Sequence, residues 1–168
     1  RGGVRDPARG RMNGAAAVWP SAALTHPGRR RRLNEDAVLA QPEKRLWLVA
    51  DGLGGHEAGD VASALVRDNV ARTERLAPFS AFVDRIEDTL RLLNHHLVHE
   101  ARERFGGRTM GCTVVALIVE GHLGVCLWAG DSRLYRLRGG DLRQVTRDHS
   151  PAVEAVERGE LTEAEAAL

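Results

Sequence analysis

A long one-sided helix is the sequence feature that most restricts how this chain can fold. Over Ser80–Phe105 the apolar residues recur every three or four positions and form one stripe: Phe82, Ile86, Leu90, Leu93, Leu97 and Ala101. A second helix is predicted over Ala58–Leu76, where four apolar residues share this spacing: Val61, Leu65, Val66 and Val70. Ser80 follows Pro78 and is predicted to cap the longer helix. Helices of this kind bury one face and need a flat apolar partner.

Strand-like runs on both sides of the helices supply that partner. Three runs precede them: Ala16–Leu24, which has the weakest pattern, Asp36–Ala40 and Leu46–Asp51. After them, Cys112–Val119 reads as a strand buried on both faces, and Leu123–Ala129 pairs back on it through the turn Gly121-His122. A second hairpin is predicted from two further runs: Ser132–Arg138 and Leu142–Val145, joined at Gly139-Gly140.

The order of strands, two long helices and strands favours an α+β layered domain over alternating β-α units. The chain of 168 residues is long enough for one such domain. We expect a flexible tail over residues 1–14 and the domain over residues 15–168, with Met12 as a candidate start. Thr162 and Glu165 form a capping box that predicts a last helix.

Charge and composition exclude several classes of function. Lysine and arginine number 24 against 23 acidic residues, a net charge of +1, so no general nucleic-acid footprint is expected. No apolar run is long enough to span a membrane. Cys112 and Cys126 lie in apolar runs and are read as buried thiols rather than a disulfide, which points to a cytoplasmic protein.

The segment Ala50–Gly59 is the most informative for chemistry. A buried strand delivers Asp51 to its end, and the chain then turns through Gly52, Gly54 and Gly55 before a helix begins. A carboxylate at a strand end suits a hard cation such as Mg²⁺ or Mn²⁺, and glycines allow close backbone approach. An ordinary strand-turn-helix remains open as the structural alternative.

Two familiar motifs do not fit this segment. It lacks the lysine and hydroxyl residue that end a phosphate-binding loop, and its glycine spacing is not that of a dinucleotide fingerprint. His56-Glu57 begins like a zinc-protease helix, but Asp60 stands where the second histidine is needed.

Other polar segments have both structural and functional interpretations. The run Arg29–Arg32 leads directly into Asn34-Glu35-Asp36; it could be a solvated or nucleic-acid-facing patch, or it could present one arginine to a phosphate. Asp131 in Gly130–Arg133 ends an apolar strand as Asp51 does, although a simple turn also fits. We reject a catalytic triad over Asp148-His149-Ser150, because triad members come from separated segments.

Histidines on the longer helix offer a weak metal signal. His95 and His99 have the i,i+4 spacing of a helical metal site. No third ligand is evident near them in the sequence. A polar face opposite the apolar stripe explains them better.

Taken in order, these segments resemble the PPM family of metal-dependent protein serine/threonine phosphatases, also called type 2C, and bacterial members most closely. The matching residues are Arg31-x-x-Asn34-Glu35-Asp36, Asp51–His56, Gly111–Thr113, Gly130–Arg133 and Thr146-x-Asp148-His149-Ser150. The resemblance covers Leu24 to the last residue. It implies two antiparallel sheets flanked by helices in an α-β-β-α sandwich, which is incomplete in this chain.

The resemblance also implies roles for the matching positions. Asp51 would bridge two Mg²⁺ or Mn²⁺ ions, the Gly52 carbonyl would bind one of them, and Asp131 would be a ligand of a third ion. Glu35 and Asp36 would hold metal-bound waters, Arg31 would bind the phosphate, and His56 would act as general acid. These implied roles together describe hydrolysis of phosphoserine or phosphothreonine in proteins by a metal-bridged hydroxide.

One departure from the family limits this expectation. Family domains are longer, and their later aspartates complete the metal cluster, whereas this chain stops in what resembles the flap region, Ser150–Leu168. Asp141 and Asp148 do not match those later positions. We therefore expect a shortened or partial domain with weak metal binding, acting as a monomer on a phosphorylated protein, with a bacterial Ser/Thr kinase or its targets as candidates.

A rival hypothesis from another class is a non-catalytic regulatory or binding module that keeps the phosphatase fold. The missing ligands motivate it. A third hypothesis takes Arg29–Arg32 as a nucleic-acid contact.

Overall fold

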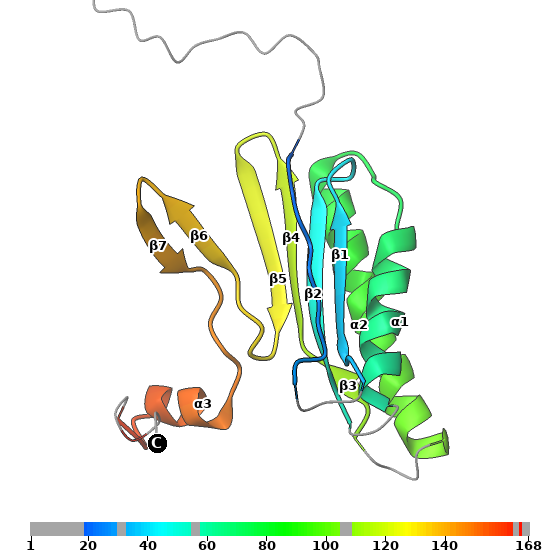
Figure 1. The fold of residues 1–168 in the computed structure, drawn as a ribbon, viewed down its shortest axis with the longest axis vertical. Helices are drawn as coiled ribbons and strands as arrows, with labels where there is room; N and C mark the ends of the chain where they lie inside the picture. Colours follow the sequence, from blue (N-terminus) through cyan, green and yellow to red (C-terminus); the bar gives the residue numbers. More distant parts are fainter. Residues whose placement is uncertain (1–18, 30–32, 55–57, 105–108, 163–164, 166–168) are drawn as a thin grey trace, which may run out of the picture.

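An antiparallel sheet forms the centre of the molecule in the computed structural model, which describes residues 19–29, 33–54, 58–104, 109–162 and 165. The tail expected over residues 1–14 lies outside these residues. The sheet has the strand order β1-β2-β4-β5 (Figure 1). Its strands are β1 (Asp36–Gln41), β2 (Leu46–Leu53), β4 (Val114–Glu120) and β5 (Leu123–Ala129), and β3 (Gly111–Cys112) pairs with the end of β2.

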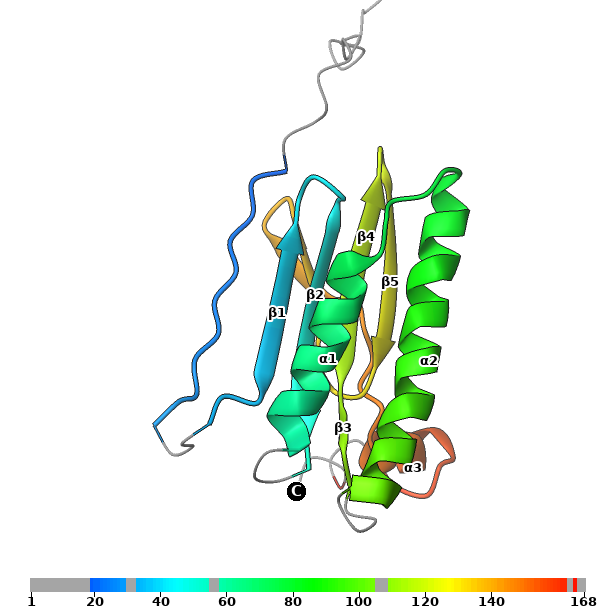
Figure 2. The ribbon, with the colours of Figure 1, turned by 90° about the vertical axis from the view of Figure 1, so that its right-hand side faces the viewer.

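Two helices cover one face of this sheet, α1 (Ala58–Arg72) and α2 (Phe79–Arg104) (Figure 2). The strand β2 alternates between buried and more exposed residues, so Leu46, Leu48 and Ala50 face the helices. Side chains from α1, α2 and β4 complete this core: Ala62, Val66, Val70, Phe82, Ile86, Leu93, Leu97, Ala116 and Ile118. The predicted helices therefore pack their apolar faces on one face of the sheet.

The helix predictions are confirmed, with different ends. The first helix begins at Ala58 as predicted but ends at Arg72 rather than Leu76. The second begins at Phe79, so Ser80 lies inside its first turn, and its prediction as the cap is wrong. Residue Phe105, the predicted last residue, lies outside the described residues.

The strand predictions after the helices are largely confirmed. The second arm of the first hairpin, Leu123–Ala129, has the predicted bounds, and the run Cys112–Val119 is interrupted at Thr113 between β3 and β4. The second hairpin is shorter than predicted, β6 (Tyr135–Arg138) paired with β7 (Asp141–Gln144). Both of its strands are exposed, and it lies apart from the central sheet in Figure 1.

The sheet face opposite the helices is only partly covered. Val49 on this face is 42% exposed, and Trp47 contacts the ring of Trp19 with 6.2 Å between centroids. The segment carrying Trp19 has no strand among its described residues, so the strand predicted over Ala16–Leu24 is wrong there. Pro20 removes a backbone donor from it, which disfavours a ladder.

The molecule also contains a short helix that the sequence pattern did not predict, α3 (Pro151–Glu157). Ser150 caps it by accepting a hydrogen bond from the N–H of Val153 at 3.2 Å. The predicted capping box is confirmed: Thr162 N–H donates to Glu165 at 2.8 Å, and Glu165 N–H donates to Thr162 at 3.3 Å.

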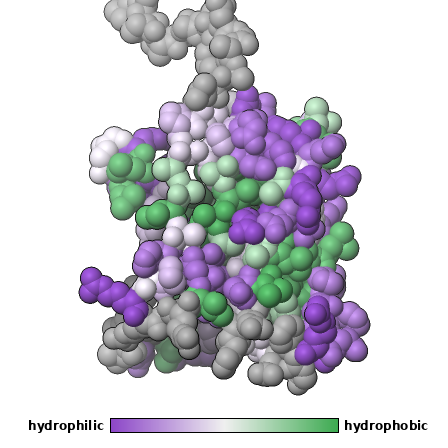
Figure 3. Space-filling model, turned by 45° about the vertical axis from the view of Figure 1, so that its right-hand side comes forward, coloured by the Kyte–Doolittle hydropathy of each residue, from purple (hydrophilic) through white to green (hydrophobic). Residues whose placement is uncertain are grey.

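Hydrophobic residues are also found on the surface, where Figure 3 shows them as green patches among hydrophilic residues. Large apolar side chains that are exposed occur in the sheet, the helices and the second hairpin; examples are Val49, Val61, Leu92, Leu137 and Leu142. None of the helices in the described ranges has both the length and the apolar character needed to cross a membrane. Two antiparallel sheets and a helical layer confirm the predicted α+β class.

Candidate metal centre

Two aspartates lie opposite each other at one end of the sheet. The strand register pairs Asp36 of β1 with Asp51 of β2. Opposed residues of antiparallel strands point to the same face, with Cβ atoms about 4.5–5.5 Å apart. That face is the one away from the helices, because Asp51 alternates with the buried Ala50 and Gly52. Like charges at this spacing repel each other, so a divalent cation beside them would stabilise the pair.

A close backbone contact between β2 and α1 brings Glu35 to the same end of the sheet. A Cβ atom on Gly52 would lie 2.1 Å from the carbonyl oxygen of Gly59, and one on Gly59 would lie 3.0 Å from Oε1 of Glu35. The N–H of Gly52 also donates to the carbonyl of Glu35 at 3.0 Å. Only glycines permit this approach, and it places the Glu35 carboxylate near the Gly52 carbonyl.

The polar groups at this end of the sheet are oxygen donors: the carboxylates of Asp36 and Asp51 on the open face, and the Gly52 carbonyl and Glu35 carboxylate beside α1. Such a set fits Mg²⁺ or Mn²⁺. Burial, followed by the charge of Asp51, raises the pKa of the nearby Cys112 thiol to about 11. No three His, Cys, Asp or Glu side chains of the described ranges could hold an ion together. A cation here would need water, carbonyls or further residues as ligands.

Asp131 lies at the same end of the sheet as Asp51. The strand β5 runs parallel to β2 with β4 between them, so the loop after Ala129 emerges at the end where Asp51 lies. Asp131 is exposed on that loop. The structure thus brings Asp131 to the edge of the candidate site without joining it to Asp36 and Asp51 in one compact cluster.

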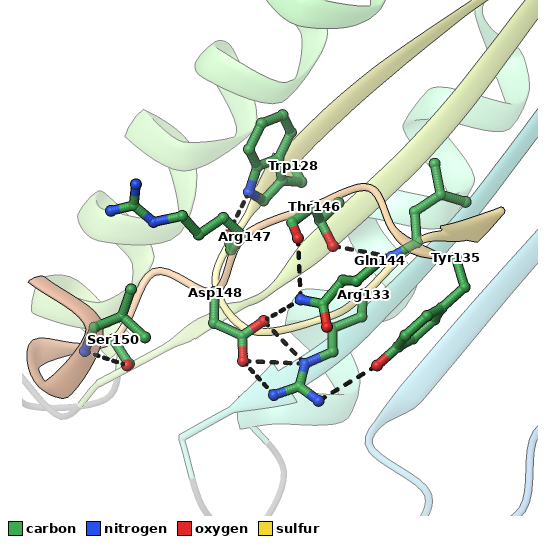
Figure 4. A network of polar contacts seen from close by, with 10 residues as sticks. Trp128, Arg133, Tyr135, Gln144, Thr146, Arg147, Asp148 and Ser150 are labelled. Atoms are coloured by element: carbon green, nitrogen blue, oxygen red, sulfur yellow. Dashed lines mark hydrogen bonds and ion pairs between the residues drawn. The ribbon is translucent and has the colours of Figure 1, made fainter. Parts of the chain in front are cut away.

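A polar network joins Arg133, just after this loop, to Asp148, just before α3 (Figure 4). Arg133 donates to both carboxylate oxygens of Asp148, with Nε–Oδ1 3.0 Å and Nη2–Oδ2 2.6 Å. Gln144 donates to the same carboxylate at 3.2 Å. The hydrogen bond from Arg133 holds the pKa of Asp148 below its ordinary value, and the same contact raises the pKa of Arg133. Asp148 is therefore a partner of Arg133 within the fold.

Most of this chain matches one known protein family. The family model described as protein phosphatase 2C matches residues 27–164. The chain belongs to the protein phosphatase 2C family. Serine/threonine protein phosphatase PstP of Mycobacterium tuberculosis is 34% identical over 145 residues, which are 86% of this chain and 28% of PstP. Serine/threonine phosphatase stp of Listeria innocua is 36% identical over 149 residues, covering 84% of this chain and 59% of that protein.

Two solved structures share the fold. PppA, a key regulatory component of T6SS in Pseudomonas aeruginosa, matches with a TM-score of 0.79 and 43% identity over 88% of this chain and 62% of that one. The catalytic domain of PstP in complex with two manganese ions matches with a TM-score of 0.71 and 35% identity, over 88% of this chain and 63% of that one. This phosphatase 2C chain therefore spans less than two thirds of these relatives.

Two predicted site residues lie outside the described residues of this phosphatase 2C chain. They are Arg31, predicted to bind phosphate, and His56, predicted as general acid. Their roles stay predictions. Two described residues near them in sequence are Asn34, which precedes β1, and Gly54, which follows β2, at the end of the two strands where Asp36 and Asp51 are paired.

The residues of the rejected triad each have a structural partner. His149 stacks on Trp128 with 5.8 Å between ring centroids and accepts from the N–H of Gly130 at 3.3 Å. Ser150 is the cap of α3, and Asp148 is bound by Arg133. These contacts agree with the rejection of a triad. His95 and His99 are exposed on α2, which agrees with a polar helix face.

Two residues beside the site were not predicted to act there. Gly59 makes room for Glu35, and Thr113 contacts Asp51 directly. A signal for Thr113 was present, since it is the polar residue within the apolar run Cys112–Val119. Nothing in the local sequence shows that Gly59 packs on Gly52, because the contact joins a strand to a helix across a turn.

Proposed function

We propose that this chain contributes metal-binding residues to a Mg²⁺- or Mn²⁺-dependent phosphatase that hydrolyses phosphoserine and phosphothreonine in proteins. The observation that carries the proposal is the opposition of Asp36 and Asp51, next to the glycine contact that holds Glu35. The family membership and the names of the relatives support the same reaction class.

Each oxygen donor at this end of the sheet has a proposed role. The Asp51 carboxylate and the Gly52 carbonyl are the proposed cation ligands, and Asp131 is proposed as a ligand of a further ion. Glu35 and Asp36 are proposed to orient water through hydrogen bonds. When bound, divalent ions supply electrostatic stabilisation of phosphoryl oxygens and lower the pKa of water at the site.

The proposed phosphate-binding and proton-donating groups are Arg31 and His56. A guanidinium can hold two phosphoryl oxygens at once, which orients the ester for attack. An imidazolium can protonate the departing serine or threonine oxygen, which avoids expelling an alkoxide. Their support is the sequence pattern and the family.

We propose a phosphorylated protein as substrate, with a bacterial Ser/Thr kinase or its targets as the class to test first, and a monomer as the acting form. The cytoplasm is the proposed location. Its support is that Cys112 and Cys126 are unpaired thiols, as proteins in a reducing compartment have.

The test is hydrolysis of p-nitrophenyl phosphate and of a phosphothreonine peptide by the full-length protein. We expect activity that requires added Mn²⁺, is lost with EDTA, and falls at least about 100-fold in Asp51→Asn. Asp141→Asn is the matched control, because Asp141 is an exposed strand aspartate paired with Arg143 and lies in the other sheet. It should keep wild-type activity.

Activity that survives both EDTA and Asp51→Asn would overturn the proposed mechanism. If the protein binds phosphopeptide but shows no hydrolysis with any divalent ion, the rival function holds, a non-catalytic module with the phosphatase fold.

A further inference from the structure

Thr113 occupies a special place in the sheet. It lies between β3 and β4, and the register on both sides, Gly52 with Cys112 and Val49 with Val115, puts it opposite Asp51. It is 5% exposed, although it carries a hydroxyl within an apolar run. A buried hydroxyl needs hydrogen-bond partners, so its contacts reveal its task.

Both backbone polar groups of Asp51 are held by this one residue. The N–H of Thr113 donates to the carbonyl of Asp51 at 2.8 Å. The N–H of Asp51 donates to the hydroxyl Oγ1 of Thr113 at 3.3 Å. The backbone that carries the Asp51 carboxylate is therefore fixed by the Thr113 backbone and by its side chain.

The same hydroxyl reaches the loop that carries Asp131. Oγ1 of Thr113 lies 2.5 Å from Oγ of Ser132. Gly130 packs on the other side of this threonine, since a Cβ atom there would lie 2.7 Å from its Cγ2 atom, and the φ of +99° at Gly130 also favours glycine. The residues before and after Asp131 are thus both in contact with the residue that holds Asp51.

We propose that Thr113 is a positioning residue that sets the spacing between the carboxylates of Asp51 and Asp131 and thereby the affinity for divalent cations. The inference rests on the proposed function, since it assumes that these carboxylates serve a cation. Hydrogen-bonded residues behind metal ligands orient them, and their loss typically lowers metal affinity about 10- to 100-fold. A hydroxyl suits this position because it can donate and accept at once, which valine cannot.

The test is calorimetric titration of the metal-free, full-length protein with Mn²⁺. Thr113→Val, which keeps the shape and removes the hydroxyl, should weaken Mn²⁺ binding about 10- to 100-fold. Thr113→Ser restores the hydroxyl and should bind like the wild type. Ser132→Ala removes only the link to the Asp131 loop and should weaken binding as well, which keeps the inference testable if Thr113→Val does not fold.

Thr146→Val is the matched control. Thr146 is also 5% exposed, and its hydroxyl accepts a backbone N–H, that of Leu134 at 3.0 Å. The control should lose stability to a similar degree and keep the wild-type affinity for Mn²⁺. A purely structural role for Thr113 predicts instead that both valine variants keep that affinity.

The outcomes separate this inference from the proposed function. If Asp51→Asn abolishes Mn²⁺ binding while Thr113→Val and Ser132→Ala bind like the wild type, the positioning role is wrong and the metal site stands. If Asp51→Asn also binds like the wild type, the metal site itself is wrong. Loss of affinity in Thr113→Val and its recovery in Thr113→Ser supports the positioning role.

Discussion

At the scale of single residues, the site depends on groups that leave space as much as on groups that bind. Gly52 and Gly59 touch through their backbones, and this contact sets Glu35 beside the end of β2. Thr113 holds the backbone of Asp51 from the neighbouring strand. The carboxylates are therefore placed by residues that carry no charge, and substitutions at those residues should act on stability and on the site together.

Gly52→Ala tests the glycine contact. The new Cβ atom would lie 2.1 Å from the Gly59 carbonyl oxygen, so the strand or the helix must move. We expect a loss of at least about 3 kcal/mol in the free energy of unfolding, measured by urea denaturation. Gly124→Ala is the control, since a Cβ atom there would meet only Leu117 Cδ1, at 3.6 Å; it should gain about 0.5–1 kcal/mol. Equal effects of the two substitutions would contradict the contact.

The pair of Arg133 and Asp148 gives a prediction about pH. The folded state lowers the pKa of Asp148, chiefly through its hydrogen bond to Arg133. A lowered carboxylate pKa stabilises the fold above the unfolded value, about 3.9, and the stabilisation is lost as the pH falls through the lower folded value. A double-mutant cycle of Asp148→Asn and Arg133→Gln should therefore show favourable coupling at pH 6 that shrinks below about pH 4.

The exposed pair of Asp141 and Arg143 is the control for that cycle. It has a single contact, at 2.5 Å, with both side chains more than half exposed. Its coupling should be small at both pH values. A coupling between Arg133 and Asp148 that does not change with pH would show that the carboxylate charge is not what binds them.

At the scale of elements, the helices and the central strands could be predicted because each has a regular apolar pattern and packs in one core. The strand β5 pairs with β4 as predicted, and α1 and α2 differ from prediction only near their ends. The wrong predictions concern segments that do not pack in the hydrophobic core. The strand predicted over Ala16–Leu24 has no ladder partner in its described part, and β6 is shorter than its alternating pattern.

The helix α3 and the shape of the site could not be read from periodicity. The helix α3 has only one buried side chain, Ala155, so it leaves no apolar stripe in the sequence. Its signal was instead the cap Ser150 followed by Pro151. Asp51 was predicted from its place at a strand end and Asp36 through the family resemblance, but their opposition follows from the register of β1 on β2, which local sequence does not specify.

Ser150→Ala tests the cap of α3. Losing the bond to the N–H of Val153 should destabilise this short helix by about 1 kcal/mol. Because α3 contributes little to the core, faster hydrogen exchange over residues 151–157 should be the main effect, with a small change in global stability. Ser80→Ala is the control, since Ser80 lies within α2, and it should leave exchange in that helix nearly unchanged. Unchanged exchange in α3 would contradict the cap.

At the scale of the whole molecule, Asp36 and Asp51 lie on the sheet face that the helices leave open. The open face carries exposed apolar residues such as Val49, and the second sheet, β6 and β7, is exposed along both strands. The chain spans 59% of the Listeria phosphatase and 28% of PstP. Asp36 and Asp51 are opposed at one end of the central sheet, so a cation bound beside them should relieve their repulsion and raise the stability of the fold.

Thermal unfolding with and without Mn²⁺ tests the central claim that Asp51, opposed to Asp36, belongs to a divalent-metal site. A ligand that binds only the folded state at 100 times its dissociation constant adds about 2.7 kcal/mol of stability. We predict that saturating Mn²⁺ raises the melting temperature of the wild type and of Asp141→Asn, and that Asp51→Asn shows no such rise. An equal rise in wild type and Asp51→Asn, or no rise in the wild type, would contradict the claim.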